Sequence, residues 1–252
     1  MKWRGRVEKY LKSVRQQEVL HFALVDPEKV NDLNKLKTIL ENLVSAGTNA
    51  ILIGGSLSVT GYDIDPIVDI VEELDVPSIL FPGSVAGLSP RADAILFLSL
   101  LNSENTYYVI GAQVYAAPVI KRFGIEVLPT AYLIVGYGGA AGYMGFARPL
   151  PFEKPEIGAA FALAAKYLGM RYLYLEAGSG APQPVPDEFV KYIRNAVEDD
   201  LFIIVGGGIR DPETACRIAC SGADAIVTGT VIERDPQRAL EIVKRIKRCQ
   251  KT

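Results

Sequence analysis

The chain has 252 residues, of which 49% are apolar and 22% are charged. Lysine and arginine number 27 and aspartate and glutamate number 29, so the net charge is −2, which excludes a surface that binds nucleic acid through overall positive charge. Glycine (23) and proline (15) lie below the roughly one-quarter share that marks low-complexity chains. The composition therefore predicts a folded chain with a sizeable core.

Short β-rich apolar runs alternate with amphipathic segments along the whole chain. The runs are His21–Val25, Ala50–Ile53, Ser78–Phe81, Ala94–Leu101, Thr130–Val135, Tyr172–Leu175, Phe202–Val205 and Ala225–Val227. The amphipathic segments include Asp32–Ala46, Pro66–Leu74, Glu156–Leu168, Asp187–Val197, Pro212–Ser221 and Pro236–Arg248. Apolar strands separated by helices are typical of a parallel sheet covered by helices. Eight such units favour one (β/α)₈ TIM-type barrel over residues 1–252, rather than an open doubly wound sheet.

One long stretch, Val127–Ala147, has no charged residue. It is long enough to span a membrane, but Pro129 and five glycines make it a poor helix, so we expect an unusual loop and no transmembrane segment. The N-terminal region lacks the apolar core of a signal peptide. Three cysteines without framework spacing favour a reducing, cytoplasmic compartment. Cys216 and Cys220 share a helix face, and we expect them to pack against the sheet without a metal.

The sharpest local motif is the run Gly206-Gly207-Gly208, which follows the seventh strand, and Gly229-Thr230 follows the eighth. Glycines let backbone N–H groups converge on one oxyanion, and the next helix start adds the positive end of its dipole. In a TIM-type barrel, the loops after strands 7 and 8 are the usual phosphate site. The alternative is that these glycines only form tight turns.

The sixth strand ends in Tyr174-Leu175-Glu176, followed by Ala177-Gly178-Ser179-Gly180. Strand alternation places Tyr172, Tyr174 and Glu176 on one face. A carboxylate at a strand end next to a glycine turn is a candidate to bind a substrate hydroxyl and accept its proton. The alternative is that Glu176 caps the turn that follows.

The first strand ends in Asp26, directly before Pro27, which holds the aspartate in an extended conformation. With Ser56 after the second strand, Asp26 offers hard oxygen ligands for Mg²⁺ and leaves positions for substrate phosphates. The alternative is that Asp26 caps the first helix. Lys29 is either a ligand for a diphosphate or a solvated residue. His21, at the start of its strand, is expected to be structural.

Aromatic residues are concentrated in and before the uncharged stretch. They are Tyr107, Tyr108, Tyr115, Tyr132, Tyr137, Tyr143 and Phe146. Such a surface suits either a groove for a long apolar substrate tail or the interface of a homo-oligomer. For the tail, we expect the groove to include Tyr115 and Tyr132.

The motifs together resemble those of the archaeal geranylgeranylglyceryl phosphate synthases, with the bacterial heptaprenylglyceryl phosphate synthases as relatives. The resemblance covers nearly the whole chain. It rests on Leu24-Val25-Asp26-Pro27, Gly54-Gly55-Ser56, Phe81-Pro82-Gly83, Tyr172 to Gly180, Val205 to Arg210 and Thr228-Gly229-Thr230. It implies a prenyltransferase that joins sn-glycerol 1-phosphate to geranylgeranyl diphosphate and forms the first ether bond of archaeal lipids.

The resemblance also implies roles for individual residues. Mg²⁺ is expected at Asp26 and Ser56, and Asp26 and Glu176 are expected to be catalytic. The glycerol phosphate is expected to bind Tyr174, Leu175, Glu176, Ala177, Gly178, Ser179, Gly180, Gly206, Gly207, Gly208, Gly229 and Thr230. Some family members carry a lysine shortly before the aspartate, whereas this chain has Ala23 and Leu24, so a lysine for the diphosphate has to come from elsewhere.

Two other functions are compatible with the same residues. A sugar-phosphate isomerase needs the glycine turns but not the aromatic, uncharged segment. A non-catalytic phosphate-binding protein needs neither Asp26 nor Glu176.

Overall fold

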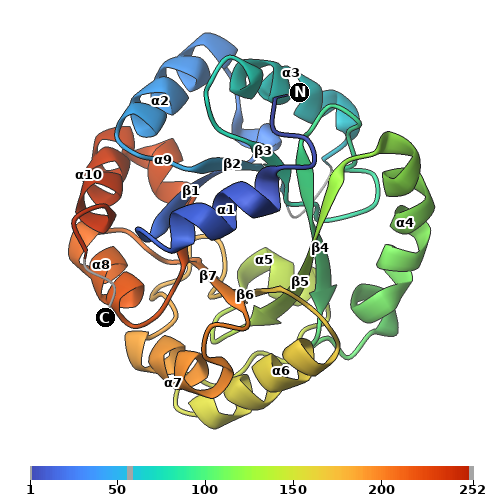
Figure 1. Ribbon diagram of the computed structural model, residues 1–252, viewed down its shortest axis with the longest axis vertical. Coiled ribbons are helices and arrows are strands. Elements are labelled where there is room, and N and C mark those ends of the chain that lie inside the picture. The colour runs from blue at the N-terminus through green and yellow to red at the C-terminus, as the bar shows by residue number, and fades with distance from the viewer. Residues whose placement is uncertain (1, 56–58, 250–252) are drawn as a thin grey trace.

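The computed structural model describes residues 2–55 and 59–249, and within them eight parallel strands close into a barrel (Figure 1). The strands are β1 (Leu20–Val25), β2 (Ala50–Ile53), β3 (Ser78–Leu80), β4 (Ala94–Leu100), β5 (Glu126–Ile134), β6 (Tyr172–Glu176), β7 (Phe202–Gly206) and β8 (Ala225–Thr228). They pair in sequence order, and β8 returns to β1. The (β/α)₈ barrel predicted from the apolar runs is therefore confirmed.

Helices surround the barrel. They are α1 (Val7–Arg15), α2 (Leu33–Ser45), α3 (Gly61–Glu72), α4 (Ala112–Phe123), α5 (Gly139–Met144), α6 (Pro155–Tyr167), α7 (Asp187–Val197), α8 (Pro212–Cys220), α9 (Thr230–Arg234) and α10 (Pro236–Ile246). Two further segments are the 3₁₀ turn η1 (Pro27–Lys29) and the π-helical turn η2 (Tyr107–Gly111). Helix α3 begins earlier than its expected start at Pro66, because the Asp63 carboxylate accepts a hydrogen bond from the Thr60 N–H (2.8 Å) and caps the helix there.

The third strand–helix unit is incomplete. Residues 81–93, all of which the structure describes, connect β3 to β4 without a helix. The segment contains Pro82, Gly83, Gly87 and Pro90, which disfavour a helix by removing N–H donors and by adding backbone freedom. The expectation of eight complete strand–helix units is therefore wrong at this point. No helix from the β3–β4 connection covers the outer side of β4 next to α4.

The strand register divides the apolar side chains into two cores. Tyr172 and Tyr174 point into the barrel, where they pack with residues such as Phe22 and Phe202. Leu173 and Leu175 point outward and pack among the helices. This alternation places the next inward position, Glu176, at the carboxyl end of the barrel interior.

Helix α1 crosses the amino-terminal end of the barrel, on the viewer's side in Figure 1. Its apolar residues Val7 and Leu11 join the barrel interior core. Its first N–H groups, on Val7 and Glu8, donate to the Glu126 carboxylate at the start of β5 (2.7 and 3.0 Å). Because α1 closes this end, access to the barrel interior is from the carboxyl end.

The uncharged stretch from Val127 to Ala147 is more regular than the loop we expected. It forms most of β5 and then α5. The turn between them, at Gly138 and Gly139, has positive φ angles and packs backbone to backbone on Gly178, where a Cβ atom would lie 2.7 Å from Gly138 C and Gly139 N. Burial in the barrel accounts for the lack of charge in the β5 part of the stretch, whereas Tyr137, Tyr143 and Phe146 in its second half are exposed. No helix in the described ranges is long and apolar enough to cross a membrane.

Two residues discussed above lie away from the carboxyl end. His21 is fully buried and contacts the hydroxyls of Thr48 (2.9 Å) and Thr228 (2.8 Å). Burial lowers the pKa of His21 to about 3, so it is neutral and structural, as expected. Cys216 is buried, as expected, but it also forms a disulfide with Cys249, which the cysteine spacing did not predict.

Candidate active site

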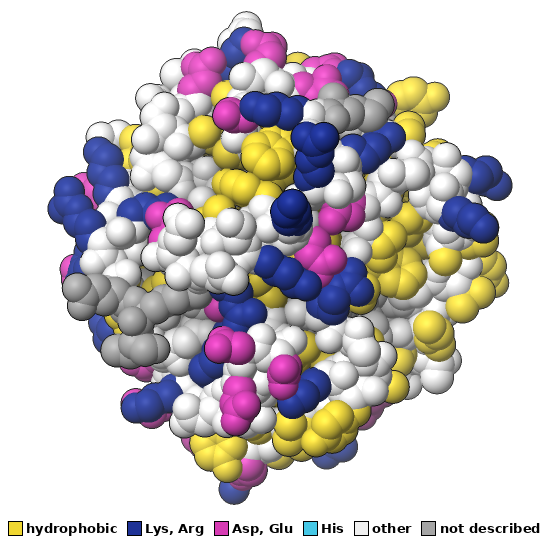
Figure 2. All heavy atoms as spheres, viewed as in Figure 1, with side chains coloured by type: hydrophobic (Ala, Val, Ile, Leu, Met, Phe, Trp, Pro, Cys, Tyr) yellow, Lys and Arg dark blue, Asp and Glu magenta, His cyan; other side chains and the backbone are white. Residues whose placement is uncertain are grey.

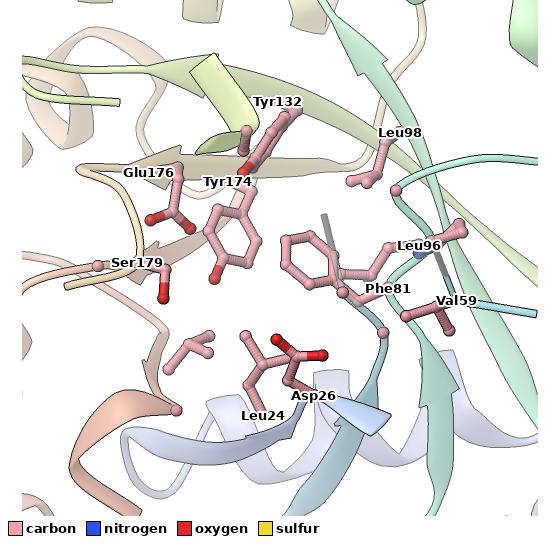
Figure 3. A pocket seen from close by; sticks show the side chains of 18 of the residues that line it. Leu24, Asp26, Val59, Phe81, Leu96, Leu98, Tyr132, Tyr174, Glu176 and Ser179 are labelled. Atoms are coloured by element: carbon pink, nitrogen blue, oxygen red, sulfur yellow. The ribbon is translucent and has the colours of Figure 1, made fainter. Parts of the chain in front are cut away.

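A cavity of about 740 Å³ opens at the carboxyl end of the barrel. Figure 3 shows Glu176 and Ser179 on one side and Leu96, Leu98 and Val59 on the opposite side. Tyr174 and Phe81 lie between the two sides, and Asp26 lies near them at the end of β1. The cavity therefore has a polar end and an apolar end that are joined by aromatic rings.

Glu176 lies at the polar end and is only 6% exposed. Its Oε1 atom accepts a hydrogen bond from the Gly178 N–H (2.6 Å), so the capping alternative is correct for one oxygen. Burial raises the pKa of Glu176 to about 7, against the opposing effects of the Gly178 N–H and the Tyr174 hydroxyl. A carboxylate with this pKa is suited to accept a proton near neutral pH.

Three glycine-containing loops meet beside Glu176. A Cβ atom on Gly207 would lie 2.3 Å from Glu176 Oε1 and 2.5 Å from the Gly178 nitrogen, and Gly207 and Gly208 have φ angles of +83° and +71°. Only glycine permits this conformation and this approach. The Ser179 and Thr230 hydroxyls lie 3.2 Å apart, between the loops after β6 and β8. The expected phosphate-binding segments are therefore brought together.

The segments expected to bind phosphate offer loop backbone and hydroxyls more than helix dipoles. Helix α9, which Thr230 begins, has only five residues, so its dipole is weak. The start of α8 is already capped, because the Asp211 carboxylate accepts from the Thr214 N–H (2.9 Å). Arg210 also lines the cavity, although it was not predicted as a site residue. Its guanidinium donates to the carbonyls of Gly180 (3.0 Å) and Ala181 and fixes the loop after β6.

Four of the expected substrate-binding residues do not line the cavity. Leu175 and Ala177 have fully buried side chains that pack in the outer core toward the helices. Gly178 and Gly206 serve the packing of neighbouring loops, since a Cβ on Gly206 would lie 2.2 Å from the Tyr174 hydroxyl. The expected residues that do line the cavity are Tyr174, Glu176, Ser179, Gly180, Gly207, Gly208, Gly229 and Thr230.

Asp26 lines the cavity at the end of β1, beside Gly54 and Gly55. Its Oδ1 atom accepts from the Glu28 N–H (3.3 Å) and caps η1, so the capping alternative holds here too. Its Oδ2 atom lies 3.3 Å from Lys29 Nζ, which also contacts Glu233 Oε1 (3.1 Å) on α9. Burial lowers the pKa of Lys29, but Glu233 and Asp26 more than compensate and raise it. Lys29 is therefore a cation at the cavity edge.

Among the described residues, Asp26 is the one expected ligand for Mg²⁺ at this end of the cavity. Within the described ranges, the one cluster of three or more His, Cys, Asp or Glu ligand atoms close enough for an ion is the cysteine group Cys216, Cys220 and Cys249. Ser56, the other expected ligand, lies outside the described residues. One carboxylate together with substrate phosphates is a normal arrangement for Mg²⁺, so the residues present fit the ion when a diphosphate is bound.

Three aromatic rings lie near one another in the middle of the cavity. Phe81 and Tyr174 are nearly parallel with ring centroids 5.0 Å apart, and Tyr132 meets them edge-on at 5.8 and 5.3 Å. Phe81, which comes directly after β3, was not predicted as a site residue, although it stands in the Phe81-Pro82-Gly83 turn at a strand end. The expected groove residue Tyr132 does line the cavity.

The apolar end of the cavity leaves the barrel beside β4. It is lined by Leu96 and Leu98 from the inner face of β4, and also by Ile95 and Phe97 from the outer face. Ala116 and Ile120 of α4 form the facing wall. This path exists because no helix follows β3. Tyr115 is 70% exposed on the other side of α4, so its predicted place in the groove is wrong.

The fold and the site define a class of protein, a TIM-barrel enzyme with a buried carboxylate beside glycine loops and a long apolar arm. The PcrB family model matches residues 12–247. A geranylgeranylglyceryl phosphate synthase from Sulfolobus acidocaldarius is 51% identical over all of this chain and 98% of its own. The chain therefore belongs to the PcrB family, as a member of its geranylgeranylglyceryl phosphate synthase group of enzymes.

Solved structures agree with this assignment. GGGPS from Thermoplasma volcanium is 37% identical and superposes with a TM-score of 0.88 over 95% of this chain and 96% of its own. The (S)-3-O-geranylgeranylglyceryl phosphate synthase from Thermoplasma acidophilum, in complex with its substrate sn-glycerol-1-phosphate, is 39% identical, with a TM-score of 0.89 over 96% and 98%. The similarity extends over nearly the whole barrel.

Proposed function

We propose that this enzyme transfers a geranylgeranyl group from its diphosphate to the carbon-3 hydroxyl of sn-glycerol 1-phosphate. The observation that carries the proposal is that one continuous cavity runs from the Glu176 and glycine-loop end to an apolar arm between β4 and α4. A substrate pair of one small phosphate and one long apolar diphosphate matches these two ends. The relatives named above support the same substrates.

The glycerol phosphate binds at the polar end. Its phosphate meets the backbone N–H groups of Gly207, Gly208 and Thr230 and the hydroxyl of Ser179. Its carbon-3 hydroxyl then lies at Glu176, which holds the hydroxyl and takes its proton as the oxygen attacks carbon 1 of the prenyl chain. The bond from that carbon to the diphosphate breaks, and the diphosphate leaves with the bonding electrons.

The diphosphate binds at Asp26 and Lys29. Lys29 supplies a positive charge from this chain, and Glu233 holds it in place from the neighbouring α9. Mg²⁺ bound by Asp26 and the diphosphate would neutralise negative charge on the leaving group. The rings of Phe81, Tyr132 and Tyr174 exclude water and present π faces to the positive charge that develops on the allylic carbon.

The direct test is incubation of the purified protein with labelled sn-glycerol 1-phosphate and geranylgeranyl diphosphate, with and without Mg²⁺. We expect a labelled, lipid-soluble ether and one equivalent of diphosphate, dependent on Mg²⁺. Release of diphosphate without an ether, or no turnover at all, would contradict the proposed function.

The apolar arm should limit the length of the prenyl donor. Ala116→Phe places a ring in the arm, because Ala116 lines the cavity and is only 8% exposed. Each buried methylene contributes about 0.8 kcal/mol, so displacing two of them should reduce kcat/KM for geranylgeranyl diphosphate by roughly tenfold or more. Dimethylallyl diphosphate, which does not reach the arm, should be unaffected.

Ala117→Phe is the matched control for that experiment. It is the same change on the same helix, but Ala117 is exposed and does not line the cavity, so a ring there adds no obstacle. Equal losses for the long and the short donor, or equal effects of both variants, would place the prenyl chain elsewhere.

Lys29 should contribute to diphosphate binding independently of turnover. Lys29→Ala removes one charge-assisted contact, and we expect the affinity for inorganic pyrophosphate with Mg²⁺, measured by calorimetry, to fall by roughly tenfold or more. The affinity for sn-glycerol 1-phosphate should not change. Arg238→Ala is the control, because Arg238 lines the cavity edge but pairs with Glu241 (2.8 Å). If pyrophosphate binding falls in that variant alone, Arg238 holds the diphosphate instead.

The outer side of η2 and α4 supports a further proposal, a homo-oligomer. Tyr107, Ile110, Val114 and Tyr115 are 38–70% exposed there, and hydrophobic side chains gather over α4 at the right of Figure 2. Apolar residues on one helix face suit a second copy of the chain, and light scattering of the purified protein tests this. We also propose the cytoplasm as the compartment in which the enzyme works.

A further inference from the structure

Three sulfur atoms meet on the outer side of the barrel, away from the cavity. Cys216 and Cys220 lie one turn apart on α8, and Cys249 follows α10. Cys216 and Cys249 form a disulfide, with Cα atoms 5.9 Å apart. The Cys220 sulfur lies 4.0 Å from that of Cys216, and all three sulfurs lie within 4.8 Å of one another.

The disulfide joins two helices that stand behind the phosphate-binding loops. Helix α8 follows the loop with Gly207 and Gly208, and α10 follows α9, which begins at Thr230. In Figure 1 the two helices lie side by side. The bond therefore ties the seventh and eighth strand–helix units together at their outer surface.

Cys220 is placed to take part in exchange with this disulfide. A thiolate that attacks a disulfide must approach one of its two sulfurs, and Cys220 is within reach of both. Arg245 adjoins the same group of sulfurs, since its guanidinium lies 3.6 Å from the Cys249 sulfur and it also interacts electrostatically with Cys220. Glu213 holds Arg245 in position through an ion pair (3.0 Å).

We propose that Cys249 has two interchangeable partners on α8, so that the link between α8 and the end of α10 survives the loss of either. In the exchange, the Cys220 thiolate attacks the Cys249 sulfur, the Cys216–Cys249 bond breaks, and Cys216 leaves as a thiolate. The proton that Cys220 loses is matched by one that Cys216 gains. No oxidant or reductant is consumed, because one disulfide replaces another.

The experiment compares Cys216→Ser, Cys220→Ser, Cys249→Ser and the Cys216→Ser/Cys220→Ser double variant. Each purified full-length protein is incubated with oxidised glutathione, which supplies the two-electron oxidant that a new disulfide requires, and is then desalted, quenched in acid and alkylated. Peptide mass spectrometry identifies the disulfide, and thermal unfolding measures Tm. We expect Cys216→Ser to contain a Cys220–Cys249 disulfide and Cys220→Ser to contain Cys216–Cys249. Both should unfold near the wild-type Tm.

The Cys249→Ser and double variants should have no disulfide. A link that closes a loop of 33 residues stabilises by about 3–5 kcal/mol in the chain-entropy model, so their Tm should fall by roughly 10 °C for a domain of this size. Reductant should lower the wild-type Tm to the same value and leave these two variants unchanged.

Two results would overturn the proposal. One is a Cys216→Ser protein in which both remaining cysteines are alkylated and the Tm equals that of Cys249→Ser, which would show that Cys220 is no partner. The other is a wild-type protein with three alkylated cysteines and a Tm that reductant does not change. Neither outcome bears on prenyl transfer, because none of the three cysteines lines the cavity.

Discussion

Asp26→Asn is expected to abolish prenyl transfer while the protein remains folded and still binds sn-glycerol 1-phosphate. The amide oxygen of asparagine can accept the Glu28 N–H as Oδ1 does now, so the η1 turn should persist. The negative charge is lost, and with it the ligand for Mg²⁺ and the partner of Lys29 (3.3 Å). Because the leaving diphosphate depends on this charge arrangement, turnover should fall below detection.

Two binding measurements identify the step that Asp26 serves. Calorimetry should give unchanged affinity for sn-glycerol 1-phosphate, for which we propose the loops after β6 to β8 as the binding site, and Mg²⁺-dependent binding of inorganic pyrophosphate should be lost. Normal turnover in Asp26→Asn would remove Asp26 from the reaction. Loss of both ligands together with a lower Tm would instead mean that Asp26 acts mainly as the cap of η1.

Glu176→Gln is expected to lower kcat by roughly 10²–10⁴-fold, the usual contribution of a general base. Glutamine keeps the shape and can still accept the Gly178 N–H through Oε1, so the turn after β6 should be preserved. What it loses is the ability to take the proton of the glycerol hydroxyl. The wild-type kcat/KM should rise with pH through about 7, the pKa that burial gives Glu176, and the variant's residual rate should be flat over the same range.

The raised pKa of Glu176 also predicts that Glu176→Gln increases the stability of the protein while it lowers turnover. In the unfolded chain its pKa returns to about 4.5, whereas in the folded protein it is about 7. Between these values the folded state binds more protons at this site, so its contribution to stability falls as pH rises. Glu176→Gln cannot ionise and should be more stable than the wild type above pH 7, by at most about 3 kcal/mol.

Chemical denaturation at pH 5 and pH 8 measures this difference. If Glu176→Gln gains stability at pH 8 and loses turnover, Glu176 acts as a buried general base. A variant that loses stability at both pH values and keeps its turnover would show that Glu176 only caps the turn after β6.

The local sequence determined most of the polar end of the site. Strand alternation alone placed Tyr172, Tyr174 and Glu176 on one face, and the structure confirms that face as the inside of the barrel. The glycines after β7 could be recognised because close backbone packing permits no other residue there. The family resemblance, in contrast, carried over the segment from Tyr174 to Gly180 as one block, and so included Leu175 and Ala177, which face the outer core.

Only the tertiary structure decided where the apolar end of the cavity lies. The prolines and glycines between Phe81 and Asp93 are visible in the sequence, but the path beside β4 depends on how α4 packs across the missing helix. The pairing of Lys29 with Glu233 joins residues 204 positions apart, and the Cys216–Cys249 bond joins residues 33 apart. Periodicity and turn chemistry act over a few residues, so they determine strands, turns and the side of a strand that a residue occupies. Contacts between distant segments depend on the closure of the barrel, which brings β8 next to β1.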